Sequence, residues 1–252
     1  METSLSPALK TRVLSFCWQH ILLLFSLNLM TLGVALCVKS ALGSSVISSV
    51  PFVLSLAGGE GARVPAWTIG SYTIAMNFVL VFFQILILRR RFEGVQLFQL
   101  LIGFVFGALI DFNMSLLDTL APADLTAQAL TQLAGCTVMG IGIALEVKCG
   151  SVTMPGEGIT IAIARVTGRP FPKVKIAVDT CLVAAAIALS YLYFGAWLRD
   201  VIGFGTLFAM FYVGLVVKYT SPRLGWFDRL LGYVPGFRRY IFGLARYIRN
   251  RQ

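Results

Sequence analysis

Long apolar runs are the feature of this sequence that most constrains its fold. Most of them reach the roughly 20 residues that a helix needs to cross the hydrocarbon core of a bilayer. Only 13% of the residues are charged, against about 25% in a typical soluble domain. The sequence therefore predicts an all-α polytopic membrane protein with six transmembrane helices, at about residues 13–38, 66–88, 95–117, 126–147, 174–197 and 201–217.

Two shorter apolar runs, 42–57 and 153–166, each follow a copy of one pattern. The copies are LGVALCVK at 32–39 and IGIALEVK at 141–148. Runs of roughly 14 to 16 residues are typical of re-entrant or half-membrane helices. The similarity continues further along, because TIAMN (73–77) resembles KIAVD (175–179). We therefore expect one membrane domain, 1–217, built from two repeats, 13–117 and 126–217, followed by a basic tail, 218–252.

The distribution of positive charge bears on the topology of the short runs. If they are re-entrant, the halves are inverted, and only Lys39, Arg63 and Arg199 of the 21 Lys and Arg residues lie outside. If they span, the halves are parallel and Arg89–Arg91 moves outside as well. Because basic loops stay in the cytoplasm, the charges favour six spans, inverted repeats and two cytoplasmic termini. Full spanning of the short runs stays an alternative at this stage.

The tail has the pattern of an amphipathic C-terminal helix between Phe237 and Arg249. Apolar and basic residues fall on opposite faces of such a helix. It is typical of a helix that lies on the cytoplasmic leaflet and contacts anionic lipid headgroups. Docking of a protein partner on this helix is the alternative. The apolar face would hold Phe237, Ile241, Leu244 and Ile248, and the basic face Arg238, Arg239, Arg246 and Arg249.

The starts of the two short helices are the expected binding site. A helix that begins inside the membrane has unpaired N–H groups and a positive dipole end at membrane depth, where transporters with broken helices bind their substrates. Glu157 falls in the first turn of the second short helix, where the first copy has Ser48. A carboxylate at this depth is usually functional, although it could instead only complement the helix dipole. Ser44 and Ser48 would form the opposite wall.

Four further residues of the repeat are candidates for the same site. Asn77 and Asp179 occupy matching positions in the two halves, although Asp179 could instead pair with Lys175 one helical turn away. Lys39 and Lys148 end the repeated pattern and could bind an acidic solute group. They could equally cap the preceding helix or extend to the membrane surface.

Standard catalytic motifs are missing from the sequence. It has no Walker A, HExxH or GxSxG pattern, and its five cysteines form no CxxC pair, so we expect no enzymatic activity, no cofactor and no bound metal. Asp111, within the third span, is a weaker candidate for proton handling. The net charge of +10 suits a membrane surface, and the aromatic interleaving expected for nucleic-acid binding is absent.

Three strings, LGVALCVKSALGSS (32–45), LEVKCGSVTMPGEG (145–158) and TGRPFPKVKIAVD (167–179), support a family resemblance. In them the chain resembles the YczE/YyaS/YitT group of bacterial integral membrane proteins, most closely the YczE-like branch. The resemblance implies a multi-pass protein of the bacterial inner membrane with a transport role. It implies no particular solute.

Two functions follow from these expectations. The first is a secondary transporter or permease for a small solute, with its site at the tips of the short helices. The alternative is a non-transporting accessory or scaffold protein that serves a partner enzyme or secretion complex through its tail. The sequence leaves the oligomeric state open between a monomer and a homo-oligomer.

Overall fold

The computed structural model describes residues 7–58, 64–235, 237 and 239–241. This part of the chain is helical and contains no strand. Short 3₁₀ segments lie at Arg89–Arg91, Gly94–Leu97 and Ser221–Arg223. The α-helices are α1 (Pro7–Lys39), α2 (Val46–Ala57), α3 (Ile69–Leu88), α4 (Phe98–Leu116), α5 (Leu125–Cys149), α6 (Pro155–Thr167), α7 (Phe171–Phe194), α8 (Phe204–Thr220) and α9 (Gly225–Leu231).

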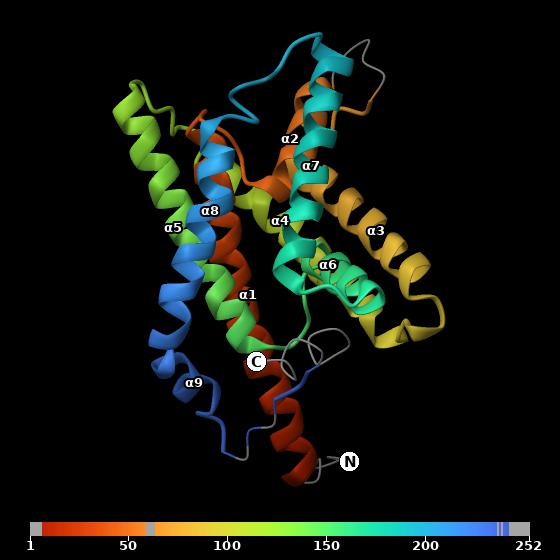
Figure 1. The fold of residues 1–252 in the computed structure, drawn as a ribbon. Coiled ribbons are helices and arrows are strands. Elements are labelled where there is room, and N and C mark those ends of the chain that lie inside the picture. Colours follow the sequence, from red (N-terminus) through yellow and green to blue (C-terminus); the bar gives the residue numbers. More distant parts are fainter. Residues whose placement is uncertain (1–6, 59–63, 236, 238, 242–252) are drawn as a thin grey trace.

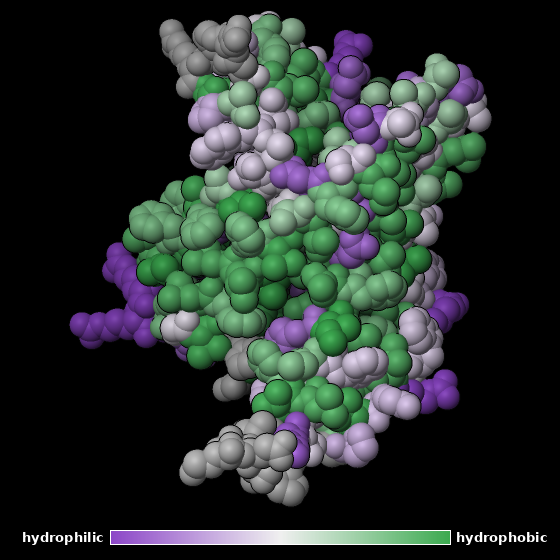
Figure 2. Space-filling model, turned by 180° about the vertical axis from the view of Figure 1, so that it is seen from behind, coloured by the Kyte–Doolittle hydropathy of each residue, from purple (hydrophilic) through white to green (hydrophobic). Residues whose placement is uncertain are grey.

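Six of the described helical segments are long and apolar enough to cross a membrane. They coincide with the six predicted runs, which confirms the predicted fold class. Their outer faces expose large apolar side chains, including Phe82 and Phe211, and hydrophobic side chains dominate the middle of the molecule in Figure 2. The protein is therefore a multi-pass membrane protein. The spans are Lys10–Lys39, Ile69–Arg91, Gly94–Leu116, Leu125–Cys149, Phe171–Phe194 and Phe204–Arg223.

The helices α2 and α6 are too short to cross a bilayer. They have 12 and 13 residues, or about 18 to 20 Å, against the roughly 30 Å of a hydrocarbon core. In Figure 1 both begin near the middle of the bundle; α2 runs toward the upper end, and α6 runs sideways and slightly down toward the end of α3. We call the lower end, where α9 lies, the α9 end, and the upper end the far end. The two predicted half-helices are thus present.

The pair α1 and α5 packs most extensively, and the two helices run in opposite directions (Figure 1). Small residues allow their backbones to approach closely. A Cβ added at Gly33 would lie 2.5 Å from the backbone nitrogen of Met139, and one added at Gly135 would lie 2.9 Å from the carbonyl oxygen of Gly33. No larger side chain fits there, so these glycines set the distance between the two helices.

Each short helix packs against the second long helix of the other half as well as its own. The helix α2 contacts α7 and α3, and α6 contacts α3 and α7. The outer long helices show the same correspondence, because α4 packs on α1 and α8 packs on α5. The two halves therefore interlock through α2 and α6.

The segment after α8 packs onto the α9 end of the bundle. Phe227 and Leu231 of α9 are buried, at 1% and 0% exposed, and the indole N–H of Trp18 donates to the carbonyl of Leu230 at 2.9 Å. The predicted amphipathic helix at 237–249 lies largely outside the described residues. Its described members, 237 and 239–241, are not helical, and the N–H of Tyr240 donates to Oε1 of Gln19 at 2.8 Å.

Candidate functional site

The first turns of α2 and α6 touch in the middle of the bundle. The helix α2 starts after Ser45, and α6 starts at Pro155 after Met154; proline suits a first helical position because it lacks the N–H that would be unpaired there. A Cβ added at Gly156 would lie 2.2 Å from Cδ1 of Ile47, so the absence of a side chain at Gly156 allows this contact. The free N–H groups at both helix starts consequently lie in one region.

Gln84 and Gln99 place buried amides beside the start of α6. Nε2 of Gln84 donates to the carbonyl of Pro155 at 3.1 Å, and Nε2 of Gln99 donates to Oε1 of Gln84 at 3.2 Å. Oε1 of Gln99 has no hydrogen-bond partner among the described residues, and neither amide atom of Gln96 has one. All three glutamines are at most 1% exposed. Such unpaired buried amide atoms are costly, and they offer hydrogen bonds to a bound solute.

Sequence reasoning did not single out these glutamines. The available signal was a polar residue within an apolar run. Gln84 lies in the 66–88 run, and both Gln96 and Gln99 lie in the 95–117 run. The structure also explains the glycine at position 158, because a Cβ there would lie 2.4 Å from Oε1 of Gln99. The glycine-rich start of α6 thus makes room for amides as well as for Ile47.

Acidic and basic side chains from α5, α6 and α7 gather around the first turn of α6. Glu157 is half-buried in the first turn and lies within electrostatic range of Glu146, Lys175 and Asp179. Asp179 is 8% exposed and accepts a hydrogen bond from Nζ of Lys175, the helical pairing that the sequence offered as its alternative role. Glu146, near the end of α5, is 3% exposed and is a member of the site that sequence reasoning missed.

This cluster carries more negative than positive charge. If Glu146, Glu157 and Asp179 were all ionised, Lys175 would leave two negative charges uncompensated. A buried unpaired charge is strongly unfavourable, and two neighbouring carboxylates resist ionising together. The cluster is therefore net negative when its acids are ionised, and a small cation bound beside Glu146 and Glu157 would offset that charge.

Asn77 faces the same interior but does not touch the charged groups through any described hydrogen bond. Its Nδ2 donates to the carbonyl of Gly103 at 3.3 Å, and its Oδ1 has no described partner. It is 2% exposed. Since residues seven apart share a helix face, Asn77 and Gln84 line one side of α3, with Asn77 nearer the far end.

The serines of the first repeat lie at the start of α2, and their hydroxyls are bound within the protein. Oγ of Ser48 accepts a hydrogen bond from Ser45 at 2.9 Å. Oγ of Ser44 donates to the carbonyl of Val201 at 3.1 Å, which ties the segment before α2 to the loop between α7 and α8. Ser48 is therefore part of the α2 tip, and Ser44 holds that tip in position.

Three predicted site residues lie away from the centre. At the far end, Nζ of Lys39 donates to the carbonyl of Asp118 at 3.2 Å, and the carboxylate of Asp111 accepts from the N–H of Gly70 at 2.8 Å, which caps the start of α3. At the α9 end, Lys148 pairs with Asp228 at 2.6 Å. The structure gives these three side chains partners that hold helix ends together.

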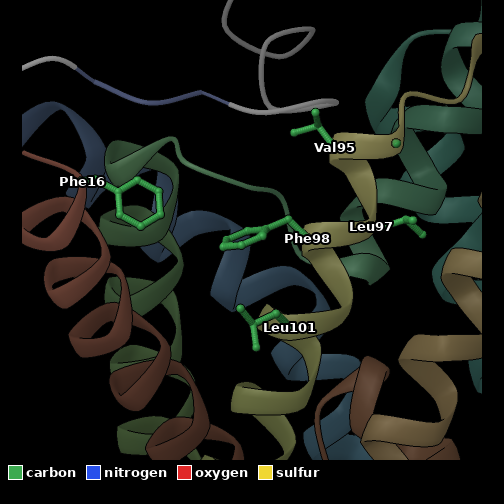
Figure 3. A pocket seen from close by; sticks show the side chains of 6 residues that line it. Phe16, Val95, Leu97, Phe98 and Leu101 are labelled. Atoms are coloured by element: carbon green, nitrogen blue, oxygen red, sulfur yellow. The ribbon is translucent and has the colours of Figure 1, made fainter. Parts of the chain in front are cut away.

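The apolar hollow between α1 and the start of α4 is distinct from this centre. It has a volume of about 460 Å³. In Figure 3, Phe16 and Phe98 point toward one another across it, with Leu101 below. Its lining side chains offer no polar group to a solute. Among the described residues, no group of three His, Cys, Asp or Glu side chains could hold a metal ion.

One protein family matches the chain. Residues 17–222 match a family of unknown function, DUF6198, a range that includes α2 to α8 and most of α1. The match does not name the YczE/YyaS/YitT group, so that similarity stays a resemblance. No curated protein and no solved structure matches the chain. Because the matched range is most of the chain, the protein belongs to the family of unknown function DUF6198.

Proposed function

We propose that this protein is a secondary transporter or permease for a small solute, coupled to a proton or another small cation. The observation that carries the proposal is the contact between the starts of α2 and α6 in mid-bundle, beside buried carboxylates and amides. Broken helices that meet near the midplane supply N–H groups to a solute and carbonyls or carboxylates to a coupling ion.

The residues of the centre divide into two roles under this proposal. Glu157 and Glu146 exchange the coupling proton or cation, and the pair Lys175–Asp179 sets the local charge. The amides of Gln84, Gln99 and Asn77 orient the solute, with Ser48 on the opposite wall. The buried amide atoms that lack partners support this role, because a bound solute would satisfy them.

The arrangement of the halves supports two inverted repeats. Corresponding helices have corresponding packing partners, and α1 and α5, which begin the two repeats, run in opposite directions (Figure 1). Repeats of this kind permit alternating access by movement of one half against the other. The ends of α3 and α6 pack near one another through Leu88 and Ile161 and are followed by Arg89–Arg91, Arg169 and Lys173. Basic residues gathered on one side of the bundle support a cytoplasmic location for that side in a bacterial inner membrane.

The described part of the tail favours transport over the accessory role. Phe227 and Leu231 of α9 are already buried against the bundle, so their apolar surface is not free for a partner. Binding of a partner by residues 242–252 stays the alternative.

Transport can be tested in proteoliposomes with a panel of small cationic, anionic and neutral solutes, with a pH-sensitive dye inside. We expect the parent protein to move at least one solute together with a pH change. Glu157→Gln removes a coupling group, and Asp179→Asn leaves Lys175 without its partner beside that group, so each should lower this flux by about tenfold or more. Asp118→Asn is the matched control, because Asp118 is an exposed acid at the far end, and it should leave the flux unchanged.

Two results would contradict the proposal. One is a parent protein that moves no solute of the panel. The other is an E157Q and D179N flux equal to that of the parent.

A further inference from the structure

A second binding site is indicated by a groove on the outer face of the bundle. The groove has a volume of about 680 Å³ and lies between α3, α6 and α7. Its walls are apolar: Phe83 comes from α3, Ile159 and Ile163 from α6, and Cys181 from α7. Phe83 is 48% exposed and Cys181 is exposed, so the groove is open to the surroundings of the bundle.

The α9 end of this groove is basic. Arg169, in the loop after α6, and Lys173, in the first turn of α7, both line it and are exposed. Neither forms an ion pair with a described residue, and no acidic residue lines the groove. Two free cations at the mouth of an apolar groove attract an anion that carries an apolar chain.

The dimensions of the groove suit one leaflet of a bilayer. Along α7 its lining extends from Lys173 to Leu182, a rise of nine helical steps or about 14 Å. Half of the roughly 30 Å hydrocarbon core is about 15 Å. With Arg169 and Lys173 at headgroup level, the apolar walls therefore follow the acyl region to near the midplane.

We propose that this groove binds an anionic phospholipid. The lipid phosphate contacts Arg169 and Lys173, and one acyl chain lies along α6 between α3 and α7. A guanidinium and an ammonium group favour a phosphate over a neutral headgroup, and basic pockets between membrane helices bind anionic lipids in this way. The site is separate from the solute site and does not depend on transport.

Lipid retention by the full-length protein tests the proposal. Native mass spectrometry compares phosphatidylglycerol with phosphatidylcholine on the parent, on R169Q/K173Q and on the control R90Q/R91Q, which removes two exposed charges at the same end. We expect the parent and R90Q/R91Q to retain phosphatidylglycerol in preference, and R169Q/K173Q to bind it at least about tenfold more weakly.

The native cysteines locate the bound lipid. In vesicles, phosphatidylglycerol should slow maleimide labelling of Cys181, which lies in the groove, but not of Cys17, which is exposed on α1. R169Q/K173Q should abolish this protection. Three results would each overturn the proposal. The first is equal retention of phosphatidylglycerol by R169Q/K173Q and R90Q/R91Q, and the second is equal retention of phosphatidylcholine and phosphatidylglycerol by the parent. The third is a rate of Cys181 labelling that phosphatidylglycerol does not change.

Discussion

Glu146 and Glu157 reach the centre from α5 and α6, and their carboxylates lie within range of each other. Only Glu157 was predictable as a site residue, because it stands in the glycine-rich start of the second short run. Glu146 is one member of a repeated string whose other copy has Cys37 at that position. Its burial depends on the close packing of α5 against α1, which no local pattern encodes.

The glutamines show the same limit at the residue scale. An apolar run with one polar residue does not reveal which way that residue faces. Gln84 and Gln99 are neighbours because α3 packs on α4, and Gln84 meets the carbonyl of Pro155 because α6 packs on α3.

Gly158 provides the first prediction at this scale. In Gly158→Ala the new Cβ would lie 2.4 Å from Oε1 of Gln99 and 2.8 Å from Oε1 of Gln84. The buried amides would have to move, and we expect the free energy of unfolding to fall by about 1–3 kcal/mol. Thermal unfolding of the purified protein measures the effect. Gly214→Ala is the control, since no atom lies within 4 Å of its added Cβ; a G158A protein as stable as G214A would show that the amides are not fixed.

At the scale of elements, the six spans and both short helices followed from the sequence because length and hydropathy decide them. The attachment of α9 to the bundle did not. A basic amphipathic pattern predicts a helix on a surface, whereas α9 and residues 239–241 gain buried apolar contacts, the Lys148–Asp228 pair and the hydrogen bonds of Gln19. These contacts connect residues 80 positions apart in the Lys148–Asp228 pair and 221 positions apart in the hydrogen bonds between Gln19 and Tyr240, so they leave no local signal.

The attachment of α9 has a predicted dependence on pH. Burial raises the pKa of Asp228, but the hydrogen bonds and charges of Lys148 and Arg239 outweigh it and hold that pKa below its ordinary value. A lowered pKa contributes stability above the ordinary value of about 3.9, and this contribution is lost as pH falls through the lower folded-state value. Attachment should therefore be constant from about pH 5 to pH 8 and weaken only in stronger acid.

Hydrogen exchange of residues 225–231, corrected for its intrinsic pH dependence, measures this attachment. Lys148→Gln should speed exchange about two- to fivefold near neutral pH, a modest effect because the pair is partly exposed to solvent. Lys218→Gln removes an exposed charge of α8 and should change nothing. Protection that is lost near pH 6, or that is insensitive to K148Q, would rule out the pair as the anchor.

At the scale of the whole molecule, the repeated pattern places two short helices in corresponding positions, but the sequence does not tell which long helix each one meets. In the structure α2 packs on α7 and α6 packs on α3. Each short helix therefore packs against a long helix of the other half. This exchange brings the start of α2 to the start of α6 and makes one shared centre instead of two separate ones.

The contact between Ile47 and Gly156 is the most direct test of this shared centre. In a variant whose native cysteines are all replaced by alanine, I47C/G156C places one cysteine in each first turn, and oxidation can join them in a disulfide. The substitution also removes the Ile47 side chain that fills the space beside Gly156. A protease site placed in the loop between α4 and α5 separates the halves after oxidation in membranes. The control is I47C/T167C, because Thr167 lies about 16 Å further along α6. We predict that oxidised I47C/G156C keeps the two fragments joined until it is reduced, while the control separates; fragments of I47C/G156C that separate without reduction would contradict a meeting of the two short helices at their first turns.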